Sequence, residues 1–176
     1  MRWIACLAVV FAAAAFAPTA YAGIIRINTG GPAYTAQSGE SWLADSYVTG
    51  GSTGVTTASI GRTTDPAIYQ TERWGNFGYA IPVANGTYDV RFHFVELWYT
   101  SSPCTGDRVF SMDVLDTPVS PDLANIDVCA AVGPNKAYVR TVQNVTVSDG
   151  VLNIQSVYGS ADDPELSGIE VVPRAS

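Results

Sequence analysis

The chain is poor in the residues on which several classes of function depend. It has one histidine and three cysteines, and 9 Lys and Arg residues stand against 16 Asp and Glu residues, which gives a formal net charge of −7. A basic stripe that could follow a phosphate backbone is absent, so the sequence argues against nucleic acid as a partner. Attraction to an anionic membrane surface is disfavoured for the same reason.

Metal-binding and phosphate-binding motifs are missing as well. His93 and the cysteines occur at spacings that match no zinc pattern. The glycine-rich stretch Gly50–Gly54 lacks the Gly-Lys-Ser/Thr of a phosphate-binding loop. Asp162 and Asp163 are ligands of the kind that calcium prefers, but no EF-hand loop surrounds them. The sequence therefore predicts no cofactor and no metal site.

Long hydrophobic runs are confined to the N-terminus. Arg2 precedes an Ala-rich apolar run over residues 4–16, and Ala20-Tyr21-Ala22 follows as a cleavage-site pattern. The run is too short for an ordinary membrane-spanning helix. The sequence predicts a signal peptide over residues 1–22 and one domain over residues 23–176, secreted or periplasmic and without membrane insertion.

The cysteines predict a disulfide bond. Cys6 lies in the predicted signal peptide, which leaves Cys104 and Cys129. Two cysteines in an exported chain are typical of one disulfide. The alternative is a pair of unpaired, buried thiols.

A helical period of apolar residues is not found in any segment, whereas a period of two is clear in one. Residues 88–94 alternate between apolar and polar, so the apolar side chains face a core and His93 faces outward. The core-facing residues are Tyr88, Val90, Phe92 and Phe94. His93 is therefore predicted to be a surface histidine rather than a catalytic base.

Further short strands alternate with turn signals. They are expected at Ile24–Ile27, Phe110–Val114, Leu152–Ile154 and Ile169–Val171, and in a further run that ends with Val145 and Val147. Asp149-Gly150 is a hairpin signal between two of them, and Gly50–Thr57 is expected to be a loop. Because no βαβ rhythm is present, the predicted fold is all-β, an antiparallel β-sandwich or barrel.

Several aromatic residues fall outside the alternating pattern. Trp98 and Tyr99 are adjacent and precede Thr-Ser-Ser-Pro, which indicates a turn, and Trp74 before Gly75 indicates another. Large rings in loops beside acids and amides suit a sugar site, because the C–H face of a pyranose packs on a ring while polar groups bond its hydroxyls. The alternative is that these rings fold over the sandwich edge.

Catalytic interpretations have weaker support. Gly50–Gly54 fits G-x-S-x-G, with Asp65 and His93 following in hydrolase order, but the strand–turn–helix context is missing. A glycoside hydrolase needs two carboxyls at a defined separation, for which Glu96 and Asp45 are the candidates. We expect Glu96 and Arg73 instead to be structural, as an ion pair or a hydrogen-bond anchor behind the site.

The chain resembles the malectin family of carbohydrate-binding domains over nearly all of Ile25 to Pro173. The specific part is a Tyr-Gln-Thr-Glu-Arg stretch followed by Phe-Gly-Tyr, together with an Asn-Gly-Thr-Tyr strand entry. The matching motifs, in order, are Ile27–Gly31, Trp42–Asp45, Tyr69–Arg73, Phe77–Tyr79, Ile81–Val83, Asn85–Tyr88, Phe92–Glu96, Arg108–Phe110 and Asp162–Glu165.

This resemblance implies a jelly-roll β-sandwich of the galactose-binding-like type and a site for glucose-containing oligosaccharides at one rim. Carried over by motif, the site residues are Tyr47, Trp74, Trp98, Tyr99 and Asp162. The family pattern has Tyr at the position of Trp74 and Tyr-Phe at Trp98-Tyr99, so all three positions keep a ring. The Cys104–Cys129 pair is outside that pattern, and we expect it to brace the loop after Tyr99.

The expected function is a secreted, non-catalytic module that binds a glucose-containing oligo- or polysaccharide by aromatic stacking. Two alternatives remain open at this point. One is a hydrolase acting on glycans, and the other is a protein-binding or matrix adhesion module that uses the same rim.

Overall fold

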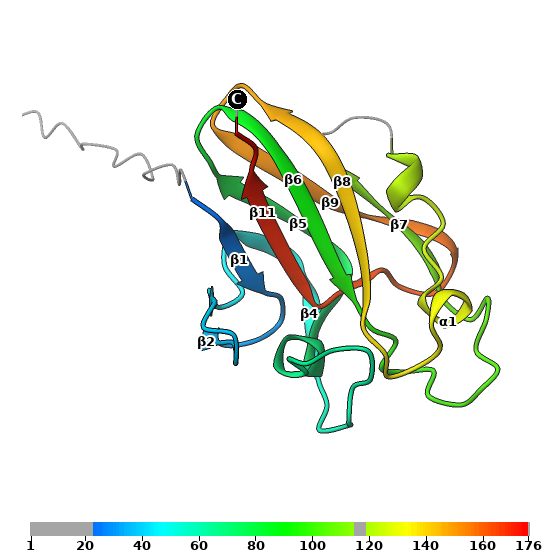
Figure 1. Cartoon of the computed structure of the whole chain (residues 1–176). Coiled ribbons are helices and arrows are strands. Elements are labelled where there is room, and N and C mark those ends of the chain that lie inside the picture. Colours follow the sequence, from blue (N-terminus) through cyan, green and yellow to red (C-terminus); the bar gives the residue numbers. More distant parts are fainter. Residues whose placement is uncertain (1–22, 115–118, 176) are drawn as a thin grey trace, which may run out of the picture.

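The computed structural model describes residues 23–114 and 119–175. The predicted signal peptide over residues 1–22, with Cys6, lies outside the described residues. Within the described ranges, the strands form two main antiparallel sheets packed face to face (Figure 1). The predicted all-β sandwich is confirmed.

One sheet has four strands in the order β1-β11-β6-β8 over the described residues. Their bounds are β1 Ile25–Asn28, β11 Gly168–Pro173, β6 Gly86–Phe94 and β8 Tyr138–Val147. In the second sheet the order is β10-β5-β9-β7. Strand β4 also pairs with β5, along the edge opposite to β10. These bounds are β10 Glu165–Leu166, β5 Thr71–Pro82, β9 Val151–Ala161, β7 Val109–Val114 and β4 Val48–Val55.

The remaining elements are short. Strands β2 and β3 form a small ribbon, and in the part of the chain that the structure describes one α-helix and two 3-10 helices lie in the connections. Their bounds are β2 Tyr34–Thr35, β3 Ser41–Trp42, η1 Ala67–Gln70, η2 Pro121–Leu123 and α1 Val128–Ala131. None of the helices in the described part of the chain is long and apolar enough to cross a membrane.

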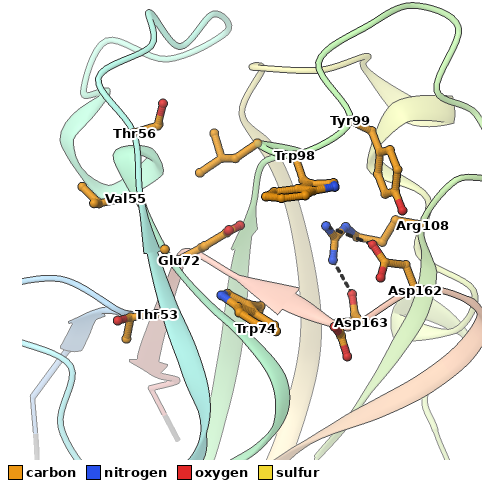
Figure 2. A pocket seen from close by; sticks show the side chains of 12 residues that line it. Thr53, Val55, Thr56, Glu72, Trp74, Trp98, Tyr99, Arg108, Asp162 and Asp163 are labelled. Carbon is orange, nitrogen blue, oxygen red and sulfur yellow. Dashed lines mark hydrogen bonds and ion pairs between the residues drawn. The ribbon is translucent and has the colours of Figure 1, made fainter.

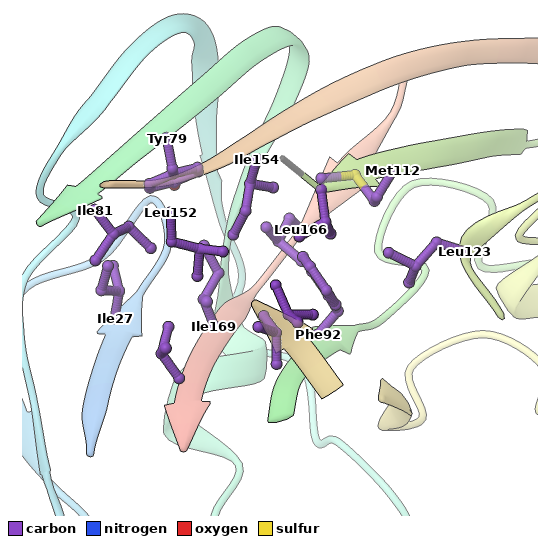
Figure 3. Close-up of a cluster of buried hydrophobic side chains, with 14 of the residues drawn as sticks. Ile27, Tyr79, Ile81, Phe92, Met112, Leu123, Leu152, Ile154, Leu166 and Ile169 are labelled. Carbon is purple, nitrogen blue, oxygen red and sulfur yellow. The ribbon is translucent and has the colours of Figure 1, made fainter. Parts of the chain in front are cut away.

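The core fills the space between the two sheets (Figure 3). The four alternating residues of β6 predicted to face it, Tyr88, Val90, Phe92 and Phe94, are all buried. They meet Phe77, Leu152 and Ile154 from the opposite sheet. Large apolar side chains that interdigitate across two sheets are what fixes the strand register, because a one-residue shift would turn them outward.

Asp149-Gly150 does not form the predicted hairpin. It connects β8 to β9, and these strands belong to different sheets. Likewise, Asn85 lies in the connection from β5 to β6, which also passes from one sheet to the other. A tight turn signal specifies where the chain reverses but not which strand becomes the partner, and jelly-roll connections of this kind alternate between the sheets.

The stretch Gly50–Thr57, predicted to be a loop, is mostly strand. β4 pairs with β5 along its length, with a bulge between Gly50 and Ser52. A Cβ at Gly50 would lie 2.5 Å from the carbonyl oxygen of Asn76, so glycine permits the close approach of the two backbones. Ser52 therefore stands in a sheet and not at a nucleophile elbow, which removes the hydrolase interpretation of this motif.

His93 is buried rather than on the surface. Its Nδ1 lies 2.7 Å from the Tyr69 hydroxyl and its Nε2 lies 3.0 Å from Glu170 Oε1. The rings of Trp42 and His93 pack in a T-shaped arrangement, with their centroids 5.5 Å apart. The outward face of β6 at this end is thus covered by a second, smaller cluster, which includes Ile68 and Tyr69. The predicted alternation of β6 is confirmed, but the sequence of one strand does not show which distant residues pack on its outward face.

Glu170 lies at the centre of this polar network, and its contacts make the stability of the fold depend on pH in the acidic range. Burial alone would raise its pKa, but the hydrogen bond with His93, the nearby charge of Arg91 and the hydrogen bond from Arg26 lower the pKa to about 2. A carboxyl whose pKa is depressed in the folded state stabilises the fold at pH values above 4.5, which is its pKa in the unfolded chain. This stabilisation is lost as the pH falls towards 2.

Glu170→Gln should therefore lower the free energy of unfolding at pH 7 by up to about 3 kcal/mol. The variant should also lose part of the decline in stability between pH 4.5 and pH 2. Urea unfolding at several pH values measures both effects. Equal stability of the two proteins at pH 7 would contradict the stabilising role of this carboxylate.

Candidate functional site

A cavity of about 550 Å³ opens at one end of the sandwich, beside β4 and β5. Its walls come from segments that are far apart in the sequence, which the two sheets bring together (Figure 2). The lining residues are Thr53–Thr56, Glu72, Trp74, Leu97–Tyr99, Arg108, Asp162 and Asp163. The volume is within the range of about 300–1,000 Å³ that small-molecule sites usually have.

Two indole rings stand at this cavity with much of their surface exposed. Trp98 is 76% exposed and Trp74 is 38% exposed. Figure 2 shows the rings on opposite sides of the cavity, with Glu72 and Arg108 between them. Large apolar side chains that a fold leaves uncovered around a hollow commonly mark a binding surface.

Trp74 lies on a strand and not in the predicted turn. In β5 it pairs with Ser52 of β4 on one side and with Glu165 of β10 on the other. The strand is irregular at the next residue, because Gly75 adopts a φ of +90°. The signal that suggested a turn, a glycine after a ring, thus marks a local distortion within a paired strand.

Trp98 and Tyr99 lie in a turn, as expected, and Glu96 holds its shape. Glu96 Oε1 accepts hydrogen bonds from the backbone N–H groups of Trp98 at 2.8 Å and Tyr99 at 2.9 Å. Its Oε2 accepts from Arg108 Nε at 2.7 Å. Glu96 is only 1% exposed, so it is a hydrogen-bond anchor behind the turn and is not placed to act as a general acid.

Arg108 connects this turn to the segment after β9. Nη1 donates to the carbonyl oxygen of Asp163 at 2.5 Å, and Nη2 lies 3.4 Å from Asp162 Oδ2. The guanidinium also lies over the ring of Tyr99, 5.7 Å from its centroid. Burial opposes the charge, but the acidic side chains of Glu165 and Glu96 raise the pKa of Arg108, so it stays a cation.

Asp162 completes the rim of the cavity. It adopts a φ of 54°, and its side chain is 30% exposed. A hydrogen bond between the Tyr99 hydroxyl and Asp162 raises the pKa of that tyrosine. Tyr158, on β9, donates to the neighbouring carboxylate, Asp163 Oδ1, at 2.8 Å. The rim therefore presents carboxylates and hydroxyls that are already oriented by contacts with one another.

The structure brings four of the five predicted binding residues to this cavity. Trp74, Trp98, Tyr99 and Asp162 line it. Tyr47 does not line it but precedes β4, with a φ of 64°, and is packed against the main core.

Some lining residues were not predicted, most clearly Glu72, Arg108 and the segment Thr53–Thr56. Glu72 could have been inferred from its spacing of two from Trp74, which places both side chains on one face of a strand.

Asp45 and Arg73 form a separate interaction. Arg73 donates to Asp45 Oδ2 through Nε at 2.8 Å and Nη2 at 2.5 Å, and the Tyr79 hydroxyl donates to Asp45 Oδ1 at 2.7 Å. Arg73 is thus structural, as expected, with Asp45 as its partner, while Glu96 pairs with Arg108. The two candidate acids of a glycosidase, Asp45 and Glu96, each lie in an ion pair outside the cavity lining.

Cys104 and Cys129 form the predicted disulfide bond, with their Cα atoms 5.5 Å apart. Cys129 Sγ lies 4.0 Å from the carbonyl oxygen of Tyr99, so the bond packs directly behind the aromatic turn. Among the residues that the structure describes, no cluster of three or more His, Cys, Asp or Glu side chains is arranged to hold a metal ion.

The family model for the malectin domain fits residues 23–169. Among curated proteins, the kinesin-like protein KIN-14E of Oryza sativa subsp. japonica is 33% identical over 162 residues, which cover 87% of this chain and 15% of that protein. KIN-14R of Arabidopsis thaliana is 33% identical over 149 residues, covering 83% of this chain and 13% of that protein. The chain thus spans a small part of the curated relatives it matches.

Solved structures share the fold at low sequence identity. The extracellular domain of ANXUR1 from Arabidopsis thaliana matches with a TM-score of 0.74 and 18% identity, covering 86% of this chain and 48% of that one. The Bacteroides uniformis β-glucuronidase matches with a TM-score of 0.72 and 18% identity, covering 86% of this chain and 18% of that one.

The position of the disulfide generates a prediction about the aromatic turn. Replacing both Cys104 and Cys129 by Ser should lower the free energy of unfolding by about 3 kcal/mol or less, because the unfolded chain is no longer cross-linked. It should also increase hydrogen exchange at the amides of Trp98 and Tyr99, because the bond lies against the Tyr99 carbonyl of the same turn. Denaturant titration and exchange measured by NMR test the two effects.

If stability falls while exchange at these two amides stays unchanged, the bond supports the scaffold only and does not order the turn. A thiol assay that finds two free thiols in the native protein would contradict the premise. The amides of β8 and β9 next to the Asp149-Gly150 connection serve as internal references for exchange.

Proposed function

The chain belongs to the malectin domain family, and from this premise we propose that it is a secreted, non-catalytic module that binds a glucose-containing oligo- or polysaccharide. The malectin domain is of a carbohydrate-binding type. The proposed binding residues are Trp74, Trp98 and Tyr99, which stack on sugar rings, and Asp162, which accepts hydrogen bonds from hydroxyls. Tyr47 is left out of this set because it does not line the cavity.

The main support for this proposal is a pair of exposed indoles on opposite sides of a cavity that is also lined by carboxylates. A pyranose has two apolar C–H faces and a polar equator of hydroxyls. Rings on two sides match the faces, while Asp162 and the backbone of the β4 wall match the hydroxyls. A site with rings but no acceptors would favour a lipid or a peptide side chain instead.

Two findings support an extracytoplasmic location. The Cys104–Cys129 disulfide is typical of an oxidising compartment. The fold is shared with the extracellular domain of ANXUR1. Both agree with the export that the N-terminal sequence predicts.

Affinity for a single short oligosaccharide should be modest. An open site buries little area, and the desolvation of sugar hydroxyls and carboxylates offsets much of the gain from contact. Useful binding to a polysaccharide would then depend on several sugar units or several copies of the module acting together.

A glycan array probed with the purified protein tests the proposed function directly. We expect signals on α- or β-glucans or on glycans capped with glucose. An absence of binding to all of these would reject the proposal. Binding to a partner protein that persists in excess free sugar would instead favour the protein-adhesion alternative.

Catalysis is tested separately, because the fold neighbours include a glycosidase that is much longer than this chain. We expect no product in a reducing-sugar assay on any glycan that binds. If product does form, Glu96→Gln distinguishes an activity of this chain from that of a contaminant, since a contaminating enzyme would be insensitive to that substitution.

The aromatic walls generate a quantitative prediction. Trp98→Ala and Trp74→Ala should each weaken binding of a glucan that scores on the array by about 1–3 kcal/mol, because each removes a large apolar surface that the ligand covers. Isothermal titration calorimetry measures the loss.

Val139→Ala provides the control, because Val139 is also an exposed apolar residue, on β8 and outside the cavity lining. It should leave the affinity unchanged. Tyr47→Ala should likewise have little effect on affinity, and a loss as large as that of the tryptophan variants would place the ligand elsewhere than in this cavity.

A further inference from the structure

The cavity contains a carboxyl group that the aromatic site does not account for. Glu72 lies on β5 two residues before Trp74, and Figure 2 shows its side chain pointing into the cavity between the two indoles. Gly54 of β4 lies opposite Glu72 in the strand pairing. A Cβ at Gly54 would lie 2.7 Å from Glu72 Oε1, so the absence of a side chain leaves room for the carboxyl.

A second carboxyl lies behind it. Glu165 of β10 is the direct partner of Trp74 in the sheet, which places its side chain on the same face as Glu72, as a diagonal neighbour. Glu165 is only 1% exposed. Within the described residues, neither of its oxygens has a hydrogen-bond donor, and the buried Oε2 of Glu72 has none either.

The nearby positive charge is already engaged by other groups. Arg108 Nε donates to Glu96 at 2.7 Å, and its distance to Glu165 Oε2 is 3.5 Å, which is long for a hydrogen bond. Its other nitrogens are directed to the segment after β9. If both carboxyls were ionised, two adjacent negative charges would lie in a dry environment with no donor between them, and this arrangement would be energetically costly.

A proton shared between the two carboxyls resolves this cost. A protonated carboxyl becomes a donor, and a neighbouring carboxylate is its natural acceptor. Burial raises the pKa of Glu165 well above its ordinary value, and the charge of Glu96 adds to the effect. Burial also raises the pKa of Glu72, while the hydrogen bond from Glu165 opposes that rise. Both trends agree with a neutral Glu165 that donates to a charged Glu72.

The surroundings of the pair contain one cation and several acids. The β4 wall contributes only uncharged residues, Thr53, Gly54 and Val55. The charged groups that face the pair from the other packed segments are Glu96, Arg108, Asp162 and Asp163. Because acids outnumber the single arginine, loss of the shared proton would leave an uncompensated negative charge in the wall of the cavity.

We propose that Glu72 and Glu165 share one proton, and that Glu72, held by this hydrogen bond, accepts a hydrogen bond from a hydroxyl of the bound sugar. The inference deepens the proposed function and rests on it for the ligand. Glu72 is then a binding residue, whereas Glu165 is a positioning residue that does not touch the sugar. The site recognises a neutral polyol edge, since a carboxylate on the ligand would be repelled by Glu72 and Asp162.

Proton sharing makes binding depend on pH in one direction. While Glu165 carries the proton, its hydrogen bond orients Glu72, and the Glu72–Glu165 pair has one negative charge. When the pH rises through the titration of Glu165, two carboxylates repel each other and draw water into the cavity. Sugar affinity should therefore be constant at mildly acidic pH and fall as the pH rises beyond that titration.

The first experiment requires no ligand. The chain has five glutamates, Glu40, Glu72, Glu96, Glu165 and Glu170. With ¹³Cδ-labelled glutamate, NMR at neutral pH should show one protonated carboxyl that titrates far above the others. Glu165→Gln should remove this signal, because the amide keeps the shape of the acid and donates an N–H to Glu72 without a titrating proton. Five deprotonated carboxyls in the wild type at neutral pH would overturn proton sharing.

The second experiment uses maltotriose, laminaritriose and cellotriose in calorimetric titrations between pH 5 and pH 9. Glu72→Gln should weaken binding of the trisaccharide that binds best by about tenfold or more, since it replaces a charged acceptor. Glu165→Gln should bind as tightly as the wild type at pH 6 and lose the decline at higher pH. Glu40→Gln, a matched change in the ribbon of β2 and β3, should behave as the wild type does.

The outcomes separate the two proposals. Wild-type affinity in Glu72→Gln would overturn the acceptor role of Glu72 while leaving the proposed function intact. A pH dependence that persists in Glu165→Gln would overturn the link between the shared proton and binding. If none of the trisaccharides and none of the arrayed glycans binds the wild type, the proposed function fails together with the acceptor role, and the NMR result alone decides proton sharing.

Discussion

The Glu96–Arg108 ion pair joins the segments that surround the cavity. Glu96 lies two residues after the end of β6 and fixes the turn containing Trp98 and Tyr99. Arg108 extends the same interaction to the backbone of Asp163. Both side chains are buried. Breaking a buried pair by removing one partner leaves an uncompensated charge, so the geometry of the aromatic turn depends on two residues that no ligand needs to touch.

Several short strands between turn signals, without a βαβ rhythm, predict the all-β class, and the alternation of Tyr88 to Phe94 gives the clearest strand, whose apolar side is buried between the two sheets. The partner of each strand was not predictable from such local signals. Asp149-Gly150 indicated a reversal, but the chain crosses to the opposite sheet there. His93 was assigned to the surface because its strand neighbours are visible in the sequence while Trp42 and Tyr69, which cover it, are remote.

The sequence pointed to this cavity where a ring interrupts the periodicity and the family pattern supplies the position. Trp74, Trp98, Tyr99 and Asp162 meet in one cavity. The residues between them were missed because Glu72 and Arg108 read as ordinary polar residues until the sheet pairing places them together. Gly50–Thr57 was expected to be a loop, since glycine and threonine are typical of loops, yet the close approach of two backbones requires those same glycines.

The position of β4 has a consequence for how this type of domain can diversify. The strand forms one wall of the cavity from the outer edge of its sheet, and its residues are mostly exposed rather than part of the core. Substitutions at Thr53 or Val55 can therefore change the shape and polarity of the wall with little effect on folding. Evolution can select new ligands along this strand while the sandwich behind it, and the ion pair that anchors the opposite wall, remain as they are.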